Sequence, residues 1–212
     1  MVSQILPPMS IPSSVLQLDL ELDKESKSYV TNYPLLVNAL KDKKMDAKGF
    51  ALAAHMVYGW MPTVLTLIPS MPKCDFSVEV EVLERAREGG QLSPIDFRIL
   101  AEAVNKSIIG ASKLLHFVNP DRYAIWDTKV YAFLIHGKVA EPVVRPAHST
   151  VNSIERFIQY QTDLALFTKR DEFFAVHQRV NEQLKYKVSP MRAAELLMFT
   201  NAPKFISNKK KN

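Results

Sequence analysis

The sequence predicts an all-α fold, because of its Gly and Pro content, its helical periodicity and its helix-boundary residues. The 212 residues include only six Gly but thirteen Pro. A shortage of Gly disfavours tight hairpins and glycine-rich phosphate loops, whereas scattered Pro often marks helix starts. Apolar residues recur at helical spacing through most of the chain, so we expect about ten helices and almost no strand.

The composition is that of a globular protein. Hydrophobic residues make up 47% of the chain and charged residues 23%, which is enough to bury a core. The single cysteine, Cys74, excludes an intrachain disulfide and fits a reducing compartment. No apolar run approaches the ~20 residues of a membrane span, and the first residues lack the basic start of a signal peptide. We therefore expect one soluble, cytoplasmic domain over 1–212 that does not contact a membrane.

The N-terminal third begins without periodicity. Residues 1–14 carry three Pro and four Ser and predict an irregular arm. Leucines at 16, 18, 20 and 22 alternate with polar residues, which favours a half-buried strand, although so short a run does not exclude a helix. Further helices are expected over 26–40, from an N-cap at Asp46 to Gly59, over 60–67 and over 76–88.

Residues 93–136 have the clearest local signals. Gly89-Gly90 closes the preceding helix, and Ser93-Pro94 supplies an N-cap followed by Pro at the first helical position. The pattern then predicts a helix, a hairpin at 108–110, a second helix over 111–118, a turn at 119–122, an extended segment ending in Asp127 and a helix over 128–135.

The C-terminal third predicts long amphipathic helices. Pro142 and Pro146 bracket a loop, after which helices are expected over 150–167, 169–184 and 190–199. Residues 203–212 form a basic tail, which is by default a solvated charge run.

Motifs for metal, nucleotide and serine-hydrolase chemistry are missing. The five histidines are dispersed and lack the i, i+4 spacing of a helical zinc site. The chain also lacks a P-loop, a G-x-G-x-x-G motif and a G-x-S-x-G motif. We expect neither a metal ion nor a cofactor.

Asp127 has two compatible interpretations. It can N-cap the helix that begins at Thr128, since Asp is among the best capping residues. Next to Trp126 and an apolar segment, the same carboxylate can also stabilise a developing positive charge on a sugar or activate water. A cap is held rigidly, so one role does not prevent the other.

The segment IIGASKLLHFVNPDRYAIWDTKV, residues 108–130, resembles the core of the helix–hairpin–helix DNA glycosylases. It is most similar to the small bacterial 8-oxoguanine-glycosylase-like proteins and to compact members that act in phage defence. The resemblance implies a fold of two helical lobes around a cleft, with the hairpin and catalytic core in 93–136. It also implies double-stranded DNA as the partner and requires no cofactor or obligate protein partner.

The resemblance assigns the catalytic residues by position. Gly110 matches the last glycine of the family's hairpin and Asp127 its catalytic aspartate, but residues 108–109 are Ile where the motif has Leu-Pro-Gly. Ser112 stands where lyase-competent members carry their Schiff-base lysine. This favours attack by water assisted by Asp127, leaving an abasic site. Lys113, about 100° further round the helix, is the second catalytic candidate.

A glycosylase must also hold an extruded base between apolar or aromatic faces and contact the DNA backbone. Trp60 and Trp126 are equally candidates for the core, His116 is more often structural, and Arg122 can form a local turn pair. The expected DNA-binding or base-binding residues are Gly110, Ser112, His116, Trp126, Tyr58, Trp60, Arg122 and Lys129.

The sequence leaves three functional hypotheses open. The first is excision of a hypermodified cytosine, such as glucosylated hydroxymethylcytosine, from phage DNA as antiviral defence. The second is repair of 8-oxoguanine, and the third is a noncatalytic helical module that binds DNA or protein. A net charge of +5 favours polyanionic partners. Either enzyme requires an opening beside Asp127 lined by Trp60 or Trp126, whereas the module requires Asp127 only as a cap.

Overall fold

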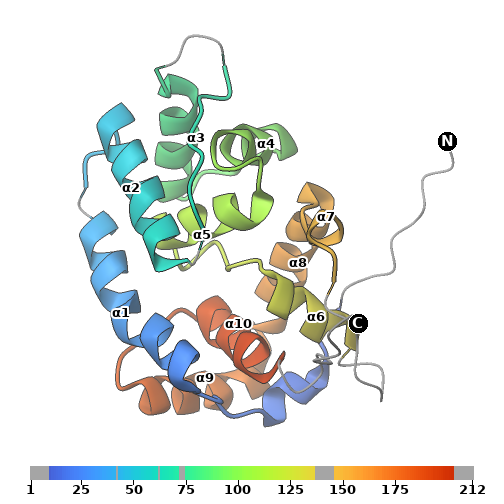
Figure 1. Cartoon of the computed structure of the whole chain (residues 1–212). Helices are drawn as coiled ribbons and strands as arrows, with labels where there is room; N and C mark the ends of the chain where they lie inside the picture. The colour runs from blue at the N-terminus through green and yellow to red at the C-terminus, as the bar shows by residue number, and fades with distance from the viewer. Residues whose placement is uncertain (1–9, 42, 62, 72–74, 137–145, 203–212) are drawn as a thin grey trace, which may run out of the picture.

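The computed structural model describes residues 10–41, 43–61, 63–71, 75–136 and 146–202, and the all-α prediction is confirmed across them. In these ranges there is no strand, only an isolated bridge between Leu67 and Val104. The helices, shown in Figure 1, are η1 (Ser13–Gln17), α1 (Lys24–Lys41), α2 (Ala47–Trp60), α3 (Ser77–Arg87), α4 (Pro94–Ala103), α5 (Ile108–Val118), α6 (Thr128–His136), α7 (His148–Val151), α8 (Ile154–Phe167), α9 (Asp171–Leu184) and α10 (Pro190–Asn201).

Local capping residues set the helix starts where the sequence predicted them. Asp46 accepts a hydrogen bond from the Gly49 N–H at the start of α2. Ser93 and Asp96 form a reciprocal capping box at the start of α4. Gly89, with φ of 78°, ends α3 in the left-handed conformation that favours glycine. These boundaries need only neighbouring residues, so they can be read from sequence.

Two predictions before α4 are wrong. The leucine repeat at 16–22 does not form a strand: η1 ends at Gln17, and the following leucines pack against the core from irregular backbone. The predicted helix over 60–67 is also absent from the described residues there. Instead, the Ile68 N–H bonds the Ala103 carbonyl and the Asn105 N–H bonds the Thr66 carbonyl. These long-range bonds replace the local ones that a helix would make.

The hairpin lies earlier than predicted. Residues 108–110 are the first turn of α5, and the chain reverses at 104–107, where Asn105 and Lys106 have φ of 57° and 50°. Ser107 N-caps α5 by accepting from the Gly110 N–H, and the Ile108 N–H bonds Asn152 Oδ1. Asn tolerates the left-handed region better than most residues. The turn therefore needs no glycine, and Gly110 is not a hairpin residue.

The predicted helix over 150–167 is two helices, because Ser153 N-caps α8 by accepting from the Arg156 N–H. The remaining helices agree with prediction to within a few residues. Most of the N-terminal arm, the loop between Pro142 and Pro146 and the tail at 203–212 lie outside the described residues.

Helix α5 occupies the centre of the molecule and packs against α1, α2, α3 and α4 (Figure 1). Helix α10 packs against α6, α8 and α9, and both α5 and α10 are buried along most of their length. The segment that joins α5 to α6 passes between these two groups of helices, so its last residue, Asp127, lies near the middle of the structure.

Gly110 is required by a close approach of α2. A Cβ atom at this position would lie 2.0 Å from Tyr58 Oη and 2.9 Å from Cζ. We predict that Gly110→Ala lowers the free energy of unfolding by about 1–3 kcal/mol, because the ring or the helix must shift. Chemical denaturation followed by circular dichroism measures the change.

Gly59→Ala is the matched control, since a Cβ there meets no atom within 4 Å in helix α2. It should leave stability unchanged or raise it by up to ~1 kcal/mol through helix propensity. Equal stability of the two variants would contradict the packing role of Gly110.

Candidate active site

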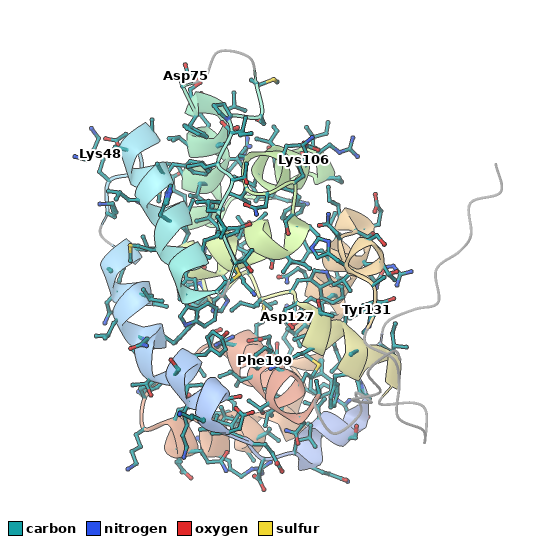
Figure 2. All side chains as sticks on the ribbon, in the orientation of Figure 1. Lys48, Asp75, Lys106, Asp127, Tyr131 and Phe199 are labelled. Carbon is teal, nitrogen blue, oxygen red and sulfur yellow. The ribbon has the colours of Figure 1, made fainter. Side chains whose placement is uncertain are left out.

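A cavity of about 420 Å³ opens between α1, α2, α5, α6 and α10. This volume lies in the range of about 300–1,000 Å³ typical of small-molecule sites. Its walls combine charged and aromatic side chains, which are Lys113, Asp127, Lys129, Arg192, Glu195, Tyr29, Tyr58, Trp60 and Phe199. In Figure 2, Asp127 lies at the centre of the molecule and Phe199 lies close to it on α10.

Lys113 and Asp127 meet at the cavity wall. Lys113 Nζ lies 3.8 Å from Asp127 Oδ2, and the two side chains are 12% and 17% exposed. The other carboxylate oxygen, Oδ1, accepts the Lys129 N–H at 2.6 Å and the Val130 N–H at 3.3 Å. Asp127 is therefore the cap of α6, as predicted. That cap directs its second oxygen toward Lys113.

Burial sets the ionisation of Lys113. Removal from water lowers the pKa of its amine, and the positive charges of Arg192 and Lys129 lower it further. The carboxylates of Asp127 and Glu195 oppose this shift, but the net direction is downward. A larger fraction of Lys113 is thus the neutral, nucleophilic amine than for a lysine in water.

Helix α10 brings a second ion pair to the cavity. The guanidinium of Arg192 contacts the carboxylate of Glu195, and the side chains are only 2% and 1% exposed. Burial raises the pKa of Glu195 to about 7, with Arg192 opposing and Asp127 adding to the shift. Arg192 Nε is buried without a hydrogen-bond partner among the described residues.

Aromatic rings close the rest of the cavity. Trp60 meets Tyr29 edge to face at 5.1 Å, and Tyr29 meets Phe199 in the same way at 6.2 Å. Lys129 Nζ lies 4.5 Å from the centre of the Phe199 ring, and Tyr58 lines the wall with its hydroxyl bonded to the Val104 carbonyl. Four of the predicted binding residues, Tyr58, Trp60, Gly110 and Lys129, line the cavity.

Four of the predicted binding residues do not line the cavity. Trp126 is fully buried, and its indole N–H donates to the Val151 carbonyl. Ser112 accepts the Trp126 N–H, and its hydroxyl lies within hydrogen-bond distance of the Ile109 and Trp126 carbonyls. His116 Nδ1 donates to the Tyr123 carbonyl and Nε2 accepts from Tyr33, while Arg122 is exposed in the turn.

The helical rotation explains this difference. Consecutive residues of α5 point about 100° apart, so Lys113 faces the cavity while Ser112 faces the segment leading to α6. The structural interpretations of Trp126 and His116 therefore hold, and Lys113 replaces Ser112 as the α5 residue that faces the site.

Sequence reasoning missed Tyr29, Arg192, Glu195 and Phe199. One signal was available: α10 reads PMRAAELLMFTN, and Arg192 and Glu195 stand three residues apart in an otherwise largely apolar helix. Charged residues at this spacing on a buried helix must be paired with each other or serve a site.

Comparison with known proteins finds no matching family model, no similar curated protein and no similar solved structure. Among the described residues, no helix has both the length and the apolar character needed to cross a bilayer. The same residues contain no group of three or more His, Cys, Asp or Glu side chains suited to holding a metal ion.

The pairing of Lys113 with Asp127 predicts how the lysine titrates. Asp127→Asn keeps a good N-cap but removes the negative charge, so the pKa of Lys113 should fall further. Reductive ¹³C-methylation followed by NMR titration measures this midpoint for each lysine.

Lys48 is the control, since it is exposed and lies far from Asp127 (Figure 2). Its resonance should be unaffected by the substitution. A Lys113 midpoint that is the same in the wild type and in Asp127→Asn would show that the two groups do not interact.

Proposed function

We propose that the protein is a DNA glycosylase that extrudes a modified base into the cavity and cleaves its N-glycosidic bond. The observation that carries the proposal is the buried Lys113–Asp127 pair in the wall of a cavity lined by aromatic rings. Breaking a glycosidic bond requires a nucleophile and a negative charge near an electron-poor sugar carbon. Lys113 and Asp127 supply these two groups from adjacent elements.

Of the two mechanisms that the sequence leaves open, the geometry favours attack by the lysine. Lys113 enters the cavity, is largely removed from water and has a lowered pKa. Its amine can form a bond to the sugar C1′, while Asp127 Oδ2 stabilises the positive charge that develops there or takes the amine proton. Water attack assisted by Asp127 is the alternative, in which Lys113 stays protonated.

The rest of the cavity suits an extruded nucleobase. Trp60, Tyr29 and Phe199 offer apolar ring faces and edges. Arg192 presents donors and Glu195 presents acceptors, which together match the polar edge of a base. The volume of about 420 Å³ accommodates a base that carries a substituent.

The resemblance to DNA glycosylases suggests two substrate classes for this cavity. We propose hypermodified cytosine in phage DNA as the first, with antiviral defence as the role, and 8-oxoguanine in double-stranded DNA as the second. Both present adjacent donors and acceptors to Arg192 and Glu195. The positive net charge of the chain and Lys129 at the cavity favour approach of the DNA backbone.

The cavity supports the enzyme over the noncatalytic module. A module needs Asp127 only to cap α6, with no opening beside it. Asp127 does cap α6, but it also borders a cavity lined by Trp60. This second feature supports the enzyme interpretation. In that interpretation, the capping hydrogen bonds hold the Asp127 carboxylate in a fixed orientation beside the cavity.

Trapping experiments test the proposal. Wild-type protein treated with borohydride should form a covalent adduct with duplex DNA containing glucosylated hydroxymethylcytosine or 8-oxoguanine, because the lysine adduct is a reducible imine. Lys113→Ala should form no adduct and lose base excision by at least 10²-fold. Asp127→Asn should slow both adduct formation and base excision, as measured by gel electrophoresis with and without alkali.

Lys48→Ala, at an exposed lysine of α2, should behave as the wild type. If Lys113→Ala still produces alkali-labile sites and the wild type forms no adduct, water is the nucleophile. If no substrate acquires alkali-labile sites with any of the proteins, the glycosylase proposal is wrong.

A further inference from the structure

Glu195 is a buried acid whose role is not explained by the chemistry of Lys113 and Asp127. It lies on α10, lines the cavity and is only 1% exposed. Burying a carboxyl group of this kind is costly unless it is paired or protonated. One of its oxygens contacts Arg192, and the side chain also borders the space that a base would occupy.

Charged and titratable groups face Glu195 from several elements. Arg192 approaches from its own helix, Lys113 from α5 and Asp127 from the start of α6. The charge of Glu195 also raises the pKa of Tyr33 on α1 and of Tyr160 on α8. The negative charge of Asp127 and the loss of water favour the protonated acid, whereas Arg192 and Lys113 favour the carboxylate.

We propose that Glu195 is the general acid that protonates the departing base. This inference rests on the proposed glycosylase function and adds a third group to it. Lys113 and Asp127 act on the sugar, whereas a group on α10 faces the base. A base leaves more easily as a neutral molecule than as an anion, so a proton donor at this wall lowers the barrier.

The bond changes balance as follows. The C1′–N bond breaks and its electron pair stays on the base, while the proton of Glu195 moves to a ring nitrogen or carbonyl oxygen of that base. The lone pair of Lys113 Nζ forms the new bond to C1′, and the excess amine proton passes to Asp127 or water. The C1′–O4′ bond then breaks with its electron pair on O4′, which takes a proton from water, while the nitrogen lone pair completes the C1′=N bond of the protonated imine that borohydride reduces. Glu195, now a carboxylate, regains a proton from water.

The raised pKa of Glu195 agrees with this geometry. The pKa of Glu195 is raised to about 7, so near neutral pH a substantial fraction carries the proton. Base excision needs the acid form of Glu195, which is lost as the pH rises through about 7, and the neutral amine of Lys113, which is gained as the pH rises. The rate should therefore pass through a maximum. Glu195→Gln removes the acid, so the fall on the alkaline side of that maximum should disappear.

The test compares two reactions of the same site. Glu195→Gln should excise the base from glucosylated-hydroxymethylcytosine or 8-oxoguanine duplex DNA about 10²–10⁴-fold more slowly than the wild type. On DNA that already contains an abasic site no base departs, so the borohydride-trapped adduct should form at nearly the wild-type rate. Glu182→Gln, at an exposed residue of α9, is the matched control for both.

Excision by Glu195→Gln at the wild-type rate, or equal loss of excision and of the abasic-site adduct, would overturn the assignment. If Glu195→Gln fails to fold because Arg192 loses its partner, Glu195→Asp takes its place. Its carboxyl group stands one methylene further from the base, so it should slow excision but not adduct formation, and equal effects on both would again overturn the assignment. Failure of the wild type on both substrates and on abasic DNA would instead contradict the proposed function itself.

Discussion

The position of Asp127 governs the rest of the site. One oxygen is held by two backbone N–H groups at the start of α6, and the other faces the amine of Lys113. A capping carboxylate has little rotational freedom, so the charge beside Lys113 is held in a fixed position. Helix α6 packs against α10, which carries Glu195 on another wall of the same cavity.

Helix α10 contributes two charged side chains to the cavity. A helix buried along most of its length would normally be apolar, yet this one places Arg192 and Glu195 in the interior. Their pairing reduces the cost of burial, and the Arg192 guanidinium also lies 4.7 Å from the Tyr33 ring centre. Tyr33 in turn donates to His116, which is neutral because burial lowers its pKa to about 3. Buried contacts from His116 through Tyr33 to Arg192 therefore hold the Arg192–Glu195 pair in place.

Sequence reasoning succeeded where neighbouring residues decide the outcome. Helix starts at Asp46 and Ser93 and the cap at Asp127 depend on side chains within three positions, and all were predictable. The hairpin was misplaced because its turn is held by distant partners: the Asn105 side chain bonds the Val64 carbonyl and the Thr66 N–H. The same limit applies to the site. A sequence indicates that α5 carries Ser112 and Lys113, but only the packing of α10 and α6 decides which of them meets the cavity.

Burial shifts the pKa values of Lys113 and Glu195 in opposite directions. Together, these shifts favour the uncharged form of both groups in the cavity. Desolvation lowers the pKa of the amine and raises that of the acid. Moving one proton from Lys113 to Glu195 leaves the net charge of the cavity unchanged but removes two buried charges. The two forms contain the same number of protons, so their ratio does not depend on pH. At any given pH, the ratio of the form with a neutral amine and a protonated acid to the form with both groups charged is therefore set by how well the walls exclude water. An aromatic lining beside these groups thus contributes to their reactivity as well as to the shape of the cavity.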